Sequence, residues 1–147
     1  MAEQGIVGRG ILLDYHTWRL AQNPPIPYSS FTRSSIPLSH LLAVAAAQKT
    51  DIHFGDILLI RSGYFAEQAQ QSEEELSVLK DQAPPTFGGV EQSVEILKWI
   101  WENFSAVAGD QPSFECWRKY FTIPCFFNLF CVSPMPQQLT NENPWLT

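Results

Sequence analysis

The sequence predicts an α/β fold, in which parallel strands form a sheet and helices pack against it. Short apolar runs of strand length alternate along the chain with longer segments of helical periodicity. The resulting order, strand–helix–strand–helix–strand, is typical of parallel strand pairs. The chain has 147 residues, of which 45% are hydrophobic, so it can build one domain around a sizeable core.

The first strand is predicted within "GRGILLDYH", residues 8–16. Its apolar run, Ile11 to Leu13, is continuous and is bounded by Gly10 and Asp14. Such a run is typical of a strand that is buried on both faces. Residues 23–35, with three prolines and four serines, are predicted to form a loop.

The first helix is predicted to follow this loop, with Ser35 as its N-cap and Pro37 in its first turn. Its apolar residues recur at helical spacing: Leu38, Leu41, Leu42 and Ala45. The second strand is predicted in "FGDILLIRSG", residues 54–63, between a Gly-Asp entry turn and the exit Gly63.

Residues 66–81 are predicted to form an exposed acidic helix, which "QAPPTFGG" ends. The clearest helical pattern is "VEQSVEILKWIWENF", residues 90–104. We expect its core face to contain five apolar residues: Val90, Val94, Leu97, Trp101 and Phe104. The short run "AVAG" is then predicted to form a third strand that ends just before Asp110.

The composition changes after Glu115. Residues 116–147 are rich in aromatic side chains, contain all three cysteines (Cys116, Cys125 and Cys131) and show neither helical nor strand periodicity. We therefore divide the chain into a domain over 1–115 and a divergent aromatic tail over 116–147, which we expect to be partly disordered. The cysteines have no C-x-x-C spacing, so neither a disulfide framework nor a cysteine zinc site is expected.

Charge and hydropathy limit the partners. The net charge of −6 disfavours nucleic acid as a partner, because the phosphate backbone is itself negative. "FTIPCFFNLFCV" is too short to span a bilayer, and we see no secretory signal at the N-terminus. We expect no membrane partner and a cytoplasmic location.

Candidate metal and nucleophile residues are sparse. Asp14 and His16 lie two residues apart on the first predicted strand and form a weak candidate pair, although a hydrogen-bonded or surface histidine is the more common role. The sequence has no H-x-x-x-H pair and no G-x-S-x-G elbow. Ser62 and Ser113 are predicted to lie in loops, and neither has a histidine near it in sequence to act as a base. We therefore assign no metal ligand and no catalytic residue.

The loop "VAGDQPSFE" is the best candidate to line a site. Ligands of open α/β sheets bind beyond the carboxyl ends of strands, which is where Asp110 is expected. In this interpretation Asp110, Ser113 and Glu115 line the site. The interpretation that we favour is a structural loop, in which Asp110 and Ser113 hold backbone N–H groups and Glu115 faces solvent or caps the next turn.

Four segments resemble the fungal branch of the metal-dependent cyclase and hydrolase family, which includes kynurenine formamidases. They are "GIVGRGILLDYH", "SIPLSHLLAVAAAQ", "GDILLIRSGY" and "FGGVEQSVEILKWIWENFSAVAGDQPSFE". The resemblance implies a swivelling β/β/α fold, here a partial one. It also implies a divalent metal, zinc or manganese, and an arylformamidase-like hydrolysis of an aryl formamide or related cyclic amide in tryptophan catabolism.

The chain departs from the family at the metal site. The family has an H-x-G-T-H-x-D-type stretch before the first strand and a histidine and a glutamate after the "GDQPSFE" turn, and neither has a counterpart here. We therefore expect a truncated member that is inactive by itself and holds no cofactor, with a small amide as substrate only if it is completed. The alternative is a non-catalytic α/β interaction module that pairs with a partner or forms a homodimer.

Overall fold

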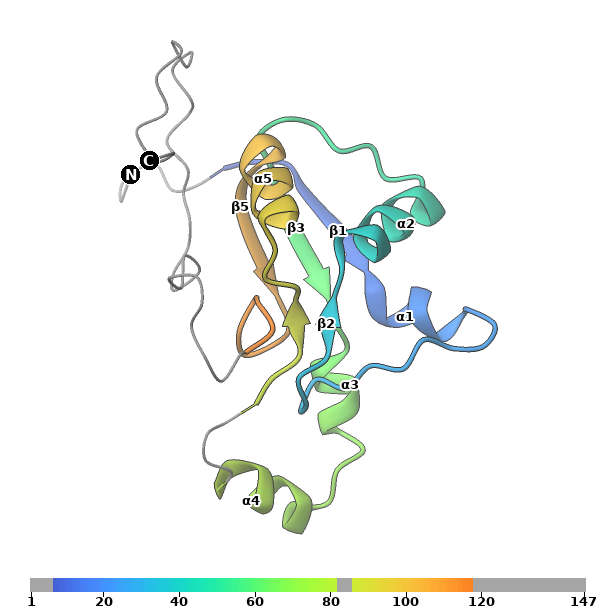
Figure 1. The fold of residues 1–147 in the computed structure, drawn as a ribbon, viewed down its shortest axis with the longest axis vertical. Helices are drawn as coiled ribbons and strands as arrows, with labels where there is room; N and C mark the ends of the chain where they lie inside the picture. The colour runs from blue at the N-terminus through green and yellow to red at the C-terminus, as the bar shows by residue number, and fades with distance from the viewer. Residues whose placement is uncertain (1–6, 82–85, 118–147) are drawn as a thin grey trace.

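The computed structural model describes residues 7–81 and 86–117, and it confirms the α/β fold class. Three parallel strands form the main sheet: β1 (Gly10–Asp14), β3 (Asp56–Arg61) and β5 (Phe104–Gly109), in the order β1-β3-β5 (Figure 1). All three predicted strands are therefore present, and their carboxyl ends meet at one edge of the sheet.

A second parallel sheet joins β2 (Ser35–Ile36) to β4 (Gly89–Val90). Neither strand was predicted, because two residues are too few to show a period. A parallel bridge between Val90 and Glu115 extends this sheet. Ile36 and Val90 are buried within the main core, so the small sheet packs against the large one.

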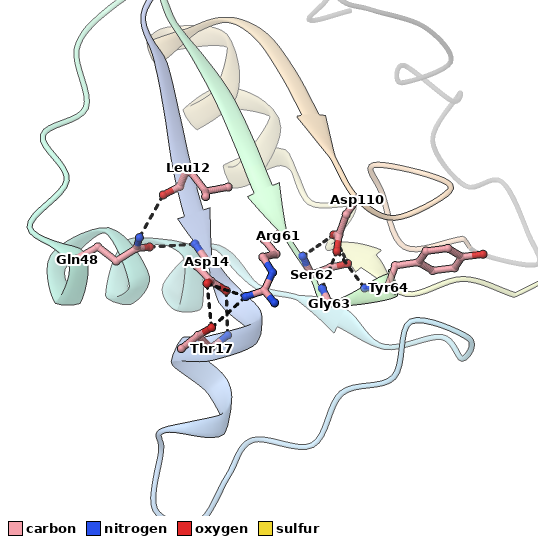
Figure 2. A network of polar contacts seen from close by, with 9 residues as sticks. All are labelled: Leu12, Asp14, Thr17, Gln48, Arg61, Ser62, Gly63, Tyr64 and Asp110. Carbon is pink, nitrogen blue, oxygen red and sulfur yellow. Dashed lines mark hydrogen bonds and ion pairs between the residues drawn. The ribbon is translucent and has the colours of Figure 1, made fainter. Parts of the chain in front are cut away.

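Five helices complete the described fold: α1 (Tyr15–Leu20), α2 (Leu38–Gln48), α3 (Tyr64–Gln68), α4 (Glu73–Asp81) and α5 (Val94–Asn103). Figures 1 and 2 view the main sheet from opposite sides, and in both α2, α5 and the small sheet lie on the same side of it. The core fills this side, where α2 contributes Leu41 and Val44 and α5 contributes Ile96 and Ile100.

The main sheet is therefore buried on one face only, and the prediction of a first strand buried on both faces is wrong. Ile11 and Leu13 are buried, but Leu12 is 49% exposed. Strand order explains this arrangement. Both β-α-β crossovers step in the same direction across the sheet, and right-handed crossovers then place α2 and α5 on one face.

Several predicted helix boundaries are also corrected. Ser35 lies in β2 and does not cap α2, which begins after the extended Pro37.

His16 lies in α1, because Asp14 ends β1 and caps this helix through the backbone N–H of Thr17. The predicted acidic helix is two helices, α3 and α4. The glycines of "FGG" lead into β4, and α5 begins later, capped by Ser93.

The predicted core face of α5 is wrong. Val94 is 67% exposed and Trp101 is 53% exposed, whereas Ile96 and Ile100 are buried. Val90 and Phe104 are buried, but as residues of β4 and β5. The predicted face combined these two strand residues with residues of the helix. It therefore lies on a different side of α5 from the face that is buried.

The predicted tail lies mostly outside the described residues. Its first two residues are part of the folded body, since the N–H groups of Cys116 and Trp117 donate to the carbonyls of Val90 and Phe87 at 2.8 and 3.0 Å. Cys116 is also buried. Within 7–81 and 86–117, no helix has both the length and the apolar character needed to cross a membrane.

Candidate functional site

The carboxyl ends of β1, β3 and β5 bring together residues that are about 47 positions apart in sequence. Two hydrogen-bond networks lie there, one centred on Asp14 and the other on Asp110 (Figure 2). This edge is the usual ligand-binding position of an open parallel sheet, so it is the candidate site.

Asp110 lies just beyond β5, and its carboxylate accepts four hydrogen bonds from the start of α3. The backbone N–H and the hydroxyl of Ser62 donate to one oxygen, at 2.6 and 2.7 Å. The N–H groups of Gly63 and Tyr64 donate to the other oxygen, both at 3.0 Å. Asp110 thus binds N–H groups that α3 cannot satisfy internally, and it joins the end of β3 to the end of β5.

Asp14 lies at the end of β1 and is also fully engaged. Its carboxylate accepts from the Thr17 N–H and hydroxyl, at 2.9 and 2.8 Å, and from the Arg61 guanidinium at 2.8 Å. Burial alone would raise the pKa of Asp14, but the hydrogen bonds from Thr17 and Arg61 outweigh it and the pKa lies below its usual value. The carboxylate is therefore ionised and bound to its own surroundings.

His16 faces the Asp110 network without bonding to it. Its Nδ1 is buried and has no hydrogen-bond partner among the described residues. The imidazole ring lies against Gly63, and a side chain at position 63 would collide with Nδ1. Burial lowers the pKa of His16, the charges of Arg19 and Arg61 lower it further, and Asp14 and Asp110 only partly oppose them. These contacts favour the neutral form of His16, and the weak candidate pair of Asp14 and His16 stays a prediction.

Tyr28, Ser30 and Ser62 form a hydroxyl cluster that the sequence did not reveal. Ser30 and Ser62 are fully buried. Burial strongly raises the pKa of Tyr28, and the neighbouring hydroxyls of Ser62 and Ser30 lower it in part. The signal for this cluster was weak, because Tyr28 and Ser30 lie in the Pro- and Ser-rich segment that was interpreted only as a loop.

The rest of the predicted site loop turns away from this network. Glu115 does not cap a helical turn but pairs with Val90 in the small sheet. Ser113 makes no hydrogen bond within the described part of the chain. The buried Gln111 holds the loop, since its side-chain amide donates to the Phe114 carbonyl at 3.1 Å. Of the three predicted loop residues, only Asp110 joins the carboxyl-edge network.

A cavity of about 440 Å³ lies between the 29–31 loop and helices α3 and α4. Three acidic residues line it, but two of them bind backbone groups. Glu67 accepts from the Ser29 hydroxyl and the Ser30 N–H, at 2.5 and 2.7 Å. Glu75 accepts from the Ser72 N–H at 2.8 Å, as in a capping box. These two carboxylates anchor a loop and a helix start.

The metal site implied by the resemblance does not fit the described residues. Within 7–81 and 86–117, no three His, Cys, Asp or Glu side chains converge as metal ligands would. A catalytic metal needs about three protein ligands and an open position for water. Here the carboxylates of Asp14 and Asp110 already bind N–H, hydroxyl and guanidinium groups. No catalytic step through a metal follows from this arrangement.

Comparisons with known proteins agree with the fold. No protein-family model and no curated protein match the chain. A solved structure described as a novel cyclase is similar, with a TM-score of 0.57 and 22% sequence identity over 78% of this chain. This chain spans about 35% of the length of that structure. At this identity, the similarity shows a shared α/β fold.

Proposed function

We propose that this chain is a catalytically incomplete member of the metal-dependent cyclase and amidohydrolase family. The fold is similar to that of a cyclase, and the quoted sequence segments resemble the fungal, kynurenine formamidase-like branch. On this proposal the chain corresponds to the central part of such an enzyme, acts in the cytoplasm and is inactive by itself. The completed enzyme would hydrolyse an aryl formamide or a related cyclic amide.

The main support is the saturation of the carboxyl-edge carboxylates. Asp110 accepts four hydrogen bonds from Ser62, Gly63 and Tyr64. Asp14 is bound by Thr17 and Arg61. Freeing the Asp110 carboxylate for a metal would leave three partly buried N–H groups without their acceptor. Freeing that of Asp14 would break its ion pair with Arg61. The described residues are thus a scaffold for a site whose ligands lie elsewhere.

The test is a hydrolysis assay with N-formylkynurenine, after incubation of the purified chain with zinc or manganese. The matched control is His16→Ala, which removes the imidazole nearest the carboxyl edge. We expect no turnover above background for either protein. Turnover by the unchanged chain that His16→Ala abolishes would contradict the proposal and would identify His16 as part of an active site.

A second candidate function is a non-catalytic interaction module. The observation that favours it is the outer face of α5, where Val94 and Trp101 are 67% and 53% exposed. Exposed apolar side chains that share a helix face are typical of a contact surface. Sedimentation velocity over a range of protein concentrations tests a homodimer, with Trp101→Ala as the variant. Dimerisation that Trp101→Ala weakens would favour this function over the first.

A further inference from the structure

The face of the main sheet opposite α2 and α5 is apolar and open to solvent. On this face Leu12 lies beside Leu59, which lies beside Ala108. Leu12 and Leu59 are 49% and 39% exposed. Parallel sheets are normally covered on both faces, so this surface requires a cover that residues 7–81 and 86–117 do not supply.

On the open face, large side chains of the central strand β3 form a ridge, and small residues in or next to the two neighbouring strands lie on either side of it. Ile57 and Leu59 of the central strand form the ridge. On one side they lie over Gly8 and Gly10, where an added Cβ would be 3.0 Å from Ile57 Cδ1 and 3.8 Å from Leu59 Cδ1. On the other side lie Ala106 and Ala108. Ile57 and Leu59 therefore already cover the glycine side, and the small Ala106 and Ala108 leave room for larger side chains on the β5 side.

The charged residues on this face lie at its carboxyl end. Figure 2 shows Asp14 and Arg61 paired there, beyond Leu12. The cover of the ridge and its flanks is therefore expected to be apolar and rich in large side chains, with little charge of its own.

We propose that residues 121–132 of the same chain, "FTIPCFFNLFCV", cover this face. The segment lies outside the described residues and contains Phe121, Phe126, Phe127 and Phe130 but no charged residue. It follows Trp117 by only a few residues, and each residue of connecting chain spans up to about 3.3–3.6 Å. Because the segment is tethered, its effective concentration at the sheet is on the order of millimolar.

A second copy of the chain fits this face less well. Two copies would each bring a net charge of −6 and would repel each other. They would also present the same ridge of Ile57 and Leu59, whereas the alanine side of the ridge leaves room for bulky side chains. By contrast, Arg118 and Lys119, which precede the proposed covering segment in sequence, are opposite in sign to the net charge of the chain. This inference goes beyond the proposed function and does not depend on it.

Thiol cross-linking in the full chain tests the proposal. Leu12→Cys places a thiol on the open face, within reach of Cys125 or Cys131 if the segment lies there. The control, Leu42→Cys, places a thiol at a leucine of similar exposure on α2, 45% against 49%. A short bismaleimide is added to dilute protein, and the linked peptides are identified by mass spectrometry. Circular dichroism verifies that each variant folds, and Leu59→Cys replaces Leu12→Cys if it does not.

We expect Leu12→Cys to form an intramolecular link to Cys125 or Cys131, with a yield about tenfold above that of Leu42→Cys. Equal yields from the two variants, or no link from either, would overturn the proposal. A link between two introduced cysteines of different chains would also overturn it and would identify a second copy as the cover.

A protease experiment gives an independent result. Leu59→Asp places a charge on the ridge and should release the segment, so that chymotrypsin cleaves after Phe126 or Phe127 about tenfold faster than in the unchanged chain. Val78→Asp, at a residue of α4 that is 71% exposed, should leave the rate unchanged. Equal cleavage rates in the unchanged chain and Leu59→Asp would contradict the proposal.

Discussion

At the scale of single residues, Asp110 is the side chain that joins the carboxyl ends of β3 and β5. Its carboxylate, just beyond β5, accepts hydrogen bonds from the residues that connect β3 to α3. We predict that Asp110→Ala lowers the free energy of unfolding by about 2–4 kcal/mol, because three backbone N–H groups and the Ser62 hydroxyl lose their acceptor. Urea denaturation measures the change.

Two matched substitutions separate this effect from a general loss. Asp110→Asn keeps one acceptor oxygen and should lose less stability than Asp110→Ala. Ser113→Ala, in the same loop, should change stability by less than about 0.5 kcal/mol. Similar losses for Ser113→Ala and Asp110→Ala would show that the loop, not the Asp110 carboxylate, supplies the stability.

The histidines predict a pH dependence of stability. Burial lowers the pKa of both His16 and His40 below the usual 6.5, so the folded state binds protons less readily than the unfolded chain. This contribution is fully present above pH 6.5 and is lost as the pH falls through the lowered pKa values. Urea denaturation at pH 7.5 and 5.5 should show lower stability at 5.5. A double variant, His16→Gln with His40→Gln, should show a smaller difference.

At the scale of elements, α5 presents two apolar faces, and only one faces the sheet. We predict that Ile100→Ala costs about 2–5 kcal/mol, because Ile100 is 7% exposed and packs in the core. Trp101→Ala, one residue later and 53% exposed, should cost less than about 1 kcal/mol. Chemical denaturation of both variants checks the orientation, and a larger loss for Trp101→Ala would contradict it.

The edge of β1 is blocked by a side chain. The amide of Gln48, at the end of α2, accepts from the Asp14 N–H at 3.0 Å and donates to the Leu12 carbonyl at 3.3 Å. It occupies groups that a neighbouring strand would otherwise bind. We predict that Gln48→Ala promotes self-association through this edge, and light scattering over time measures it. Gln70→Ala, which removes an exposed amide outside the sheet, should not have this effect.

These elements show what the sequence could and could not predict. β3 was predicted well, because Gly55 and Gly63 bound an apolar run, and both adopt positive φ. The small sheet was missed, because its strands have two residues each. Asp110 was placed correctly beyond β5. Its role as an acceptor for backbone N–H groups is confirmed. Which N–H groups it binds was not predicted, because Ser62 and Gly63 lie about 48 residues away and only the parallel pairing of β3 with β5 brings them close.

At the scale of the whole molecule, the described chain is a one-sided α/β layer. Its helices and small sheet cover one face of the main sheet, and the other face is apolar and open. At its carboxyl edge, Asp14 pairs with Arg61, and Asp110 binds the N–H and hydroxyl groups at the start of α3. The region that this chain shares with the similar solved structure is about 35% of that structure's length.

The central claim is that the carboxyl edge supports a fold and does not hold a catalytic metal. Titration calorimetry of the purified chain with zinc and with manganese tests it most directly, with Asp14→Asn and Asp110→Asn as variants. We predict no binding stronger than the weak, non-stoichiometric association that exposed carboxylates give any protein. Binding of about one metal ion per chain with micromolar or tighter affinity, lost in either variant, would contradict the claim.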